Sequence, residues 1–242
     1  KATWERLLAE KKLGYIALLM NLRNMVDAKV ARAPVEAALR EGAPKSRALP
    51  FRFISAAKHA PSFAGALSDA MVSAITVRLG GDTAVVVDVS GSMDAAISAR
   101  SQLMRWEAAG ALAILFREVA ASCRVFTFSN ALVEVPNYRG LALIEGIKRS
   151  QQHGATYLAQ ALKVLRDQAP KLDRLVVVTD EQTHDGTTPA WAAHAYLINV
   201  AGYKPGLDTS QGWKRLSGWS ERVVDWMAVE ETGAALGEGD DE

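Results

Sequence analysis

Cysteine is almost absent from this chain, and so are long hydrophobic segments. Cys123 is the single cysteine among 242 residues, so no internal disulfide can form and nothing points to an oxidising compartment. We expect it to be a buried structural thiol. The apolar stretch 108–116 is flanked by Glu107 and Arg117 and is too short to cross a membrane. Because the sequence also shows no secretory leader, we expect a cytoplasmic protein without membrane contact.

Net charge is also almost absent, at +1, yet the charged residues are unevenly distributed. Residues 1–79 contain 13 Lys and Arg against 6 Asp and Glu, residues 80–220 contain 14 against 13, and residues 221–242 contain 1 against 8. A basic front, a neutral middle and an acidic end are therefore joined in one chain. The composition, 49% hydrophobic and 23% charged, is typical of a globular protein that buries a sizeable core.

Residues 1–79 are predicted to form an all-helical segment. Apolar residues recur at helical spacing from Trp4 to Met25. Prolines divide the remainder into pieces of about 10 to 17 residues, the length of packed helical hairpins. These prolines are residues 34, 44, 50 and 61. Gly80-Gly81 marks the predicted end of the segment, and residues 233–242 are expected to form an acidic flexible tail.

Residues 80–232 alternate between predicted strands and helices. Strands are predicted over residues 83–89, 124–129, 132–135, 174–179 and 195–200, the second and third forming a hairpin. Helices are predicted over residues 101–122, 141–150, 156–167 and 220–231. This alternation predicts an α/β fold, a doubly wound and mostly parallel sheet with helices on both faces, preceded by the short all-α segment.

The most informative motif is the sequence Thr83-Ala-Val-Val-Val-Asp88-Val-Ser90-Gly-Ser92. Its apolar run predicts a strand buried on both faces, which places Asp88, Ser90 and Ser92 on the loop beyond the carboxyl end of that strand. Open α/β sheets bind their ligands at that edge. All three side chains offer oxygen donors, which suit a hard cation such as Mg²⁺ or Mn²⁺.

Two further positions extend this set of donors. The apolar strand at residues 174–179 ends in Asp180, so two buried strands deliver carboxylates to the same edge, where a divalent cation would remove the cost of two unpaired charges. Between the strands, Gly154 frees the backbone and Thr156 presents a hydroxyl just before a helix. The predicted metal ligands are therefore Asp88, Ser90, Ser92, Thr156 and Asp180.

Each of these residues, taken alone, is more often a turn former or a helix cap than a metal ligand. Their occurrence in this order, on the predicted loops, favours a complete site over that alternative. Asp94 and Glu181 lie nearby in the sequence. We expect these two acids either to surround the ion at a greater distance or to be solvated.

The five predicted ligands resemble the metal-ion-dependent adhesion site of von Willebrand factor A domains. In that family a D-x-S-x-S loop, a threonine from a second loop and an aspartate from a third surround one divalent ion. The resemblance implies that the hydroxyls bind the ion directly and that one or both carboxylates act through water. It also implies a free coordination position for an acidic side chain of a protein partner.

The helical front resembles the last repeats of the TROVE module of Ro proteins. The segments that carry the resemblance, one of them from the second half of the chain, are Trp4-x-x-Leu7-Leu8, Asn21-Leu22-Arg23-Asn24-Met25, Leu49-Pro50-Phe51-Arg52-Phe53 and Thr179-Asp180-Glu181-Gln182-Thr183. The resemblance implies a ring of helical repeats closed by an A domain, in a ribonucleoprotein that binds small noncoding RNA for RNA quality control. Residues 1–79 are too few to close such a ring. RNA binding by this chain alone is therefore expected to be weak or absent, whether it is an engineered fragment or a natural short form.

Alternative functions follow from the same residues. The basic front can be a solvated helical surface, and Phe51 and Phe53, although able to stack on RNA bases, are expected to be core anchors. No G-x-S-x-G elbow or P-loop is present, and Ser90 stands where a D-x-D phosphatase motif has its second acid. We therefore expect a non-catalytic domain that recognises an acidic ligand through its metal. The alternatives are a metal-dependent phosphoester hydrolase and a purely structural metal site.

Overall fold

The computed structural model of the chain describes residues 1–46, 48–75, 77–98, 103–201, 206–218, 220 and 222–233. Its first part is helical, as predicted, and consists of α1 (Ala2–Ala9), α2 (Tyr15–Asp27), α3 (Arg32–Gly42), η1 (Ala43–Lys45), α4 (Pro50–His59), η2 (Pro61–Phe63) and α5 (Ala64–Ala74). Pro50 and Pro61 are the first residues of α4 and η2. Proline is favoured there because its missing N–H leaves no helical hydrogen bond unmade.

The second part is built on one sheet of six strands in the order β3-β2-β1-β4-β5-β6. The strands are β1 (Leu79–Asp88), β2 (Ala120–Phe128), β3 (Leu132–Val135), β4 (Arg174–Thr179), β5 (His194–Asn199) and β6 (Lys214–Ser217). Each neighbouring pair is parallel except β2 and β3, which form the predicted hairpin. The helices of this part are η3 (Gly91–Asp94), α6 (Arg105–Val119), α7 (Leu141–Arg149), α8 (Leu158–Gln168) and α9 (Val223–Thr232).

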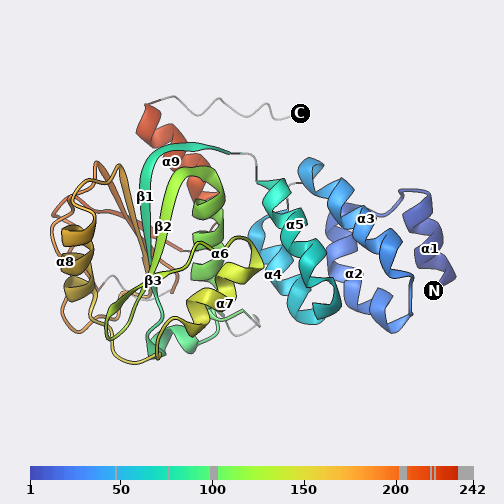
Figure 1. Cartoon of the computed structure of the whole chain (residues 1–242), viewed down its shortest axis with the longest axis horizontal. Helices are drawn as coiled ribbons and strands as arrows, with labels where there is room; N and C mark the ends of the chain where they lie inside the picture. Colours follow the sequence, from blue (N-terminus) through green and yellow to red (C-terminus); the bar gives the residue numbers. More distant parts are fainter. Residues whose placement is uncertain are drawn as a thin grey trace.

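Apolar side chains of the central strand β1 alternate between two cores. Val85 and Val87 pack into a core that includes residues of α6, α7 and α9, whereas Ala84 and Val86 pack into a second core that includes residues of α8. Figure 1 shows α8 on one face of the sheet and α6 on the other. The predicted doubly wound α/β fold is confirmed, and the continuous apolar run of β1 is explained by the cover on both of its faces.

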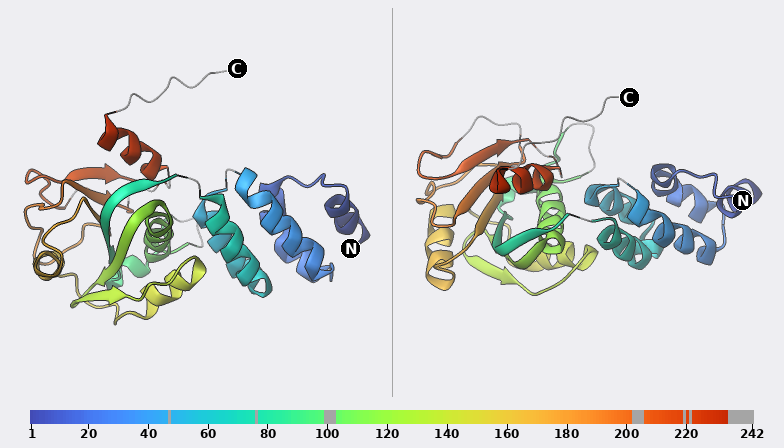
Figure 2. Two further views of the ribbon diagram at one scale, coloured as in Figure 1. Left: turned by 45° about the horizontal axis from the view of Figure 1, so that its top comes forward. Right: turned by 90° about the horizontal axis from the view of Figure 1, so that it is seen from above.

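Helix α6 lies between the sheet and the helical front (Figures 1 and 2). Residues of α2, α4 and α5 belong to the same apolar core as those of α6. Where α4 meets α6, Lys58 Nζ donates to Glu107 Oε2 over 2.6 Å. Ser68 of α5 also accepts a hydrogen bond from the backbone of Leu141 at the start of α7, over 3.1 Å. The helical front is therefore joined to the α/β part by a shared core.

Several predicted boundaries differ from the structure. The helix predicted over residues 101–122 begins at Arg105, and residues 120–122 belong to β2, so the prediction is wrong there; residues 101 and 102 lie outside the described residues. Strand β6 was not predicted, because three of its four residues are polar. Gly80 and Gly81, the predicted boundary, lie in the irregular first part of β1, where Gly81 has a φ of 80°. The predicted tail beyond residue 233 falls outside the described part of the chain.

Individual side chains can also be compared with their predictions. Phe53 is fully buried and Phe51 packs partly buried against the same core, as expected of core anchors. Cys123 as a whole is partly exposed, and burial of its thiol raises the pKa of that group to about 12. This position therefore disfavours the reactive thiolate. In the described ranges, no helix is long and apolar enough to cross a membrane.

Candidate metal centre

The five predicted ligands lie at the carboxyl edge of the sheet, on the end of β1 and on three loops. Asp88 is the last residue of β1, and the first loop, which follows it, carries Ser90 and Ser92. The second loop precedes α8 and carries Thr156, and the third follows β4 and begins with Asp180. All except Ser92 are buried, at no more than 4% exposure. Since β1 and β4 are parallel neighbours in the centre of the sheet, their carboxyl ends lie side by side. The three loops therefore converge on one edge.

The carboxylate of Asp88 is fully buried and accepts a hydrogen bond on each oxygen. Ser90 N donates to Oδ1 over 2.9 Å, and Thr179 Oγ1 donates to Oδ2 over 2.6 Å. Burial raises the pKa of Asp88 from 3.8 to about 6; hydrogen bonds from Ser90 and Thr179 oppose the rise, and the charge of Asp180 adds to it. The negative charge of Asp88 is therefore destabilised in place, and a nearby cation would stabilise it.

Asp180 has a cationic partner that the sequence analysis missed. Arg105, the first residue of α6, donates from one guanidinium nitrogen to Asp180 Oδ2 and to the carbonyl oxygen of Ser92, each over 3.1 Å. Gln182 N donates to the other carboxylate oxygen, Asp180 Oδ1, over 3.1 Å. The argument that both carboxylates at this edge lack a counter-charge is therefore wrong for Asp180. Asp88 is the acid whose charge has no ion pair among the described residues.

The second loop is held in place by the end of β2. Ser129 Oγ accepts from Gly154 N and donates to the carbonyl oxygen of Ala155, both over 2.8 Å. Asn130 Oδ1 accepts from Ala155 N over 3.0 Å. A Cβ on Gly154 would lie 2.7 Å from the Asn130 side chain, so glycine permits this close approach. Glycine is therefore required at position 154 for space and not, as predicted, for backbone freedom.

The first and second loops contact each other directly. Gly91 N donates to the carbonyl oxygen of Gly154 over 3.1 Å. The hydroxyl oxygens of Ser90 and Ser92 lie 3.2 Å apart. The Thr156 hydroxyl makes no hydrogen bond within the described part of the chain, although the residue is only 4% exposed. The loops thus bring three hydroxyls to this edge, and that of Thr156 retains its full capacity to bind a ligand.

A hollow of about 330 Å³ opens in front of these groups. Residues of all three loops line it, among them Ser92, Thr156 and His184. His184 braces the second loop, because its backbone N donates to the carbonyl oxygen of Thr156 over 2.9 Å and its Nδ1 lies 3.2 Å from Thr156 N. Carboxylate and hydroxyl oxygens beside an open hollow fit a hard divalent cation with a coordination position to spare.

The two other acids near the site have different environments. Glu181 is 4% exposed, has a φ of 61°, and its carboxylate accepts from Asn199 Nδ2 over 3.0 Å and from Arg215 over 3.0 Å. Of the two environments expected for Glu181, solvation is therefore wrong, and this acid ties the third loop to β5 and β6. Asp94 has a half-exposed side chain, with Oδ1 2.9 Å from His153 Nδ1.

Thr179 and Arg105 contact the two carboxylates of the site, and sequence reasoning missed both of these contacts. Thr179 was detectable, since a hydroxyl one residue before Asp180 in a buried strand needs a polar partner. Its oxygen donates to Asp88 and also accepts from Glu181 N over 3.0 Å. Arg105 gave no local signal, because it stands 75 residues from Asp180 in the sequence.

Comparison with known proteins agrees with this fold. Residues 83–199 match the family model of the Ro60 vWA domain. No curated protein matches the sequence. Among solved structures, the Ro (RSR) protein of Deinococcus radiodurans is similar, with a TM-score of 0.65 and 18% identity, over 94% of this chain and 54% of that chain. The chain therefore spans little more than half the length of that protein.

Two further solved structures are similar over part of the chain. One is an aerotolerance-related membrane protein from Bacteroides fragilis (TM-score 0.38, 19% identity, 49% of this chain and 66% of that chain). The other is the BatB protein from Bacteroides thetaiotaomicron (TM-score 0.39, 13% identity, 63% of this chain and 98% of that chain). The family match runs from β1 to the end of β5. Residues 83–199 are therefore similar to the von Willebrand factor A domain of Ro60, and the chain has the fold seen in a Ro protein.

Proposed function

We propose that this chain is a non-catalytic interaction domain that binds one divalent cation, Mg²⁺ or Mn²⁺, and recognises an acidic side chain of a protein partner through it. The observation that carries the proposal is the convergence of three loops whose predicted ligands are all oxygen donors, in front of an open hollow. Such a donor set suits Mg²⁺ or Mn²⁺ better than zinc, which is bound mostly through nitrogen and sulfur.

The proposed ligands divide into two groups by their hydrogen bonds. Asp88 and Asp180 each accept protein hydrogen bonds on both carboxylate oxygens, which favours their acting on the ion through water. The hydroxyls of Ser90, Ser92 and Thr156 would be the direct donors. When bound, the ion supplies a Lewis-acidic position for an anionic oxygen. The chain itself contributes the rigid loops and the hollow that admits a carboxylate side chain.

Two features support binding over hydrolysis. In the described ranges, no three His, Cys, Asp or Glu side chains converge, as zinc and two-metal hydrolases require. In the same part of the chain, no histidine nitrogen is hydrogen-bonded to a serine or threonine hydroxyl, the arrangement that activates such nucleophiles. His153 instead contacts Asp94 and the Lys148 carbonyl, and His184 contacts the backbone of Thr156.

We further propose that the chain acts within a cytoplasmic Ro-type ribonucleoprotein that binds small noncoding RNA for RNA quality control. The match to the Ro60 vWA family and the likeness to a Ro fold support this context. On the helical front, Arg32 and Arg40 both pair with Glu36, so part of its positive charge is already neutralised. For this reason we expect the chain alone to bind RNA weakly or not at all.

Calorimetric titration with Mg²⁺ and Mn²⁺ tests the metal site. Thr156→Val removes one hydroxyl at nearly constant volume and is expected to weaken ion binding by at least about tenfold, since one of few direct donors is lost. Thr188→Val is the matched control, because Thr188 is also buried but does not line the hollow. Equal affinity in the wild type and Thr156→Val, or no binding by the wild type at millimolar ion, contradicts the proposal.

Ligand recognition and catalysis are separated by a second experiment. A peptide with one Glu should bind in Mg²⁺ and be released by chelator, whereas the same peptide with Gln should not bind. Turnover of a phosphodiester substrate in Mg²⁺ or Mn²⁺, abolished by Asp88→Ala, would instead establish a hydrolase. A purely structural ion would raise the melting temperature and leave the binding of both peptides unaffected by chelation.

A further inference from the structure

Arg105 places a positive charge inside the candidate metal centre. Its side chain is 10% exposed and pairs with that of Asp180, which is 0% exposed. The same guanidinium nitrogen also donates to the carbonyl oxygen of Ser92. Arg105 therefore links the first and third loops, both of which carry proposed ligands of the ion.

The location of Arg105 carries two energetic penalties. A guanidinium loses hydration when it is buried, and Arg105 also begins the 15-residue helix α6, where the helix dipole disfavours positive charge. Glu107, in the same first turn, is the residue type that this end of a helix prefers, and its carboxylate accepts from Met104 N and from Lys58 Nζ. The contacts that offset these penalties include the Asp180 carboxylate and the Ser92 carbonyl oxygen, both in the metal centre.

We propose that Arg105 is a resident counter-cation of the metal centre, which neutralises Asp180 when no divalent ion is bound and weakens the affinity of the site for that ion. This inference rests on the proposed metal site. A second positive charge within a few ångströms of a divalent ion repels it, and the repulsion is strong because the surrounding groups are buried. Arg105 also keeps the loops in place without the ion, so the metal-free chain remains folded.

Two substitutions of Arg105 separate its charge from its packing. Arg105→Gln removes the charge and keeps a polar side chain, and it is expected to tighten Mg²⁺ and Mn²⁺ binding by about tenfold or more. Arg105→Lys retains the charge and is expected to bind the ions as the wild type does. The readouts are calorimetric affinity and melting temperature, each measured with chelator and with saturating Mg²⁺.

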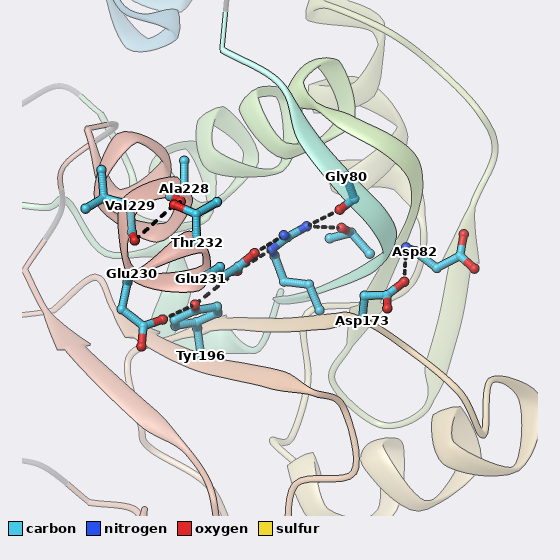
Figure 3. A network of polar contacts seen from close by, with 11 residues as sticks. Gly80, Asp82, Asp173, Tyr196, Ala228, Val229, Glu230, Glu231 and Thr232 are labelled. Atoms are coloured by element: carbon cyan, nitrogen blue, oxygen red, sulfur yellow. Dashed lines mark hydrogen bonds and ion pairs between the residues drawn. The ribbon is translucent and has the colours of Figure 1, made fainter. Parts of the chain in front are cut away.

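The structure offers a matched control at the opposite end of the sheet. Arg174, the first residue of β4, has a side chain that is 3% exposed and pairs with Glu231 of α9, with Nε 2.7 Å from Oε1. Figure 3 shows this network, in which the Tyr196 hydroxyl also donates to Glu231. Arg174→Gln breaks a buried pair of the same kind far from the three loops. It should lower the melting temperature equally with and without Mg²⁺ and leave ion affinity unchanged.

The outcomes distinguish the inference from the proposed function. The counter-cation role is supported if Arg105→Gln has a lowered melting temperature in chelator and if Mg²⁺ raises that temperature more than it does for Arg174→Gln. A variant that folds only with the ion would also support it. Ion affinity that is unchanged or weaker in Arg105→Gln, or a variant that stays unfolded in saturating Mg²⁺, overturns it. If neither the wild type nor Arg105→Gln binds an ion, the proposed metal site itself has failed. Binding by Arg105→Gln alone would support the inference, and it would contradict the proposed function of the wild type, whose site Arg105 would then keep free of the ion.

Discussion

Replacing Asp88 by Asn is expected to stabilise the metal-free chain while removing its response to divalent ions. Asp88 is 0% exposed, and its pKa is raised from 3.8 to about 6, chiefly by burial. An acid whose pKa rises on folding favours the folded state below its unfolded pKa, and this contribution is lost as the pH rises through its folded pKa. At pH 7 the ionised Asp88 therefore opposes folding of the metal-free chain.

The size of the effect follows from the same contacts. The rise from 3.8 to about 6 corresponds to about 3 kcal/mol. Asn still accepts from Ser90 N, but its amide N–H faces Thr179, whose hydroxyl loses its acceptor at a cost of about 1 kcal/mol. The expected net stabilisation is about 1 to 2 kcal/mol, or about 2 to 8 °C in melting temperature for a chain of this length.

Thermal unfolding in chelator at pH 7 and at pH 4 measures this effect. The advantage of Asp88→Asn should be present at pH 7 and largely lost near pH 4, where the folded wild type carries a protonated Asp88. Asp82→Asn is the matched control, because Asp82 lies on the same strand and is exposed; it should change little at either pH. Equal destabilisation of Asp88→Asn at both pH values refutes the reasoning. Addition of Mg²⁺ should raise the melting temperature of the wild type and of Asp82→Asn, but not that of Asp88→Asn.

Three further predictions concern the shared core and the thiol. Phe53→Ala should lower the free energy of unfolding by about 3 to 5 kcal/mol, and calorimetry should still show one transition, since Phe53 belongs to the core that includes α6; two separate transitions would contradict a shared core. A double-mutant cycle of Lys58→Met and Glu107→Gln should give a coupling energy of about 1 kcal/mol, and additivity would show that the contact between α4 and α6 does not depend on this pair. Because the pKa of Cys123 is raised to about 12, its alkylation at pH 8 should be roughly 1,000-fold slower in the folded than in the unfolded chain; similar rates would contradict its burial.

The sequence predicted the centre of the sheet well because burial on both faces leaves a clear signal. The run Val85–Val87 is apolar without interruption, and so is Leu175–Val178. Strand β6 left no such signal, because it is held by backbone pairing with β5 and by the ion pair of Arg215 with Glu181. The residues at 120–122 were misassigned because helix α6 passes directly into β2 without a turn residue to mark the change.

The candidate site was predictable only as far as strand ends and local spacing determine it. Asp88 and Asp180 both follow apolar runs, and parallel neighbouring strands bring such positions together. The environment of each acid was not predictable. Arg105 reaches Asp180 from the start of α6, a helix whose placement depends on the packing of the whole core. The difference between the two acids, of which Asp180 forms an ion pair and Asp88 forms none among the described residues, depends on the tertiary structure.

Anomalous diffraction from crystals soaked in Mn²⁺ tests the central claim most directly. The account predicts one strong peak at the carboxyl edge of the sheet, within coordination distance of the hydroxyls of Ser90, Ser92 and Thr156, and its loss in crystals of Thr156→Val. A soaked crystal with no peak between the three loops, or with manganese bound only elsewhere on the chain, would contradict the account.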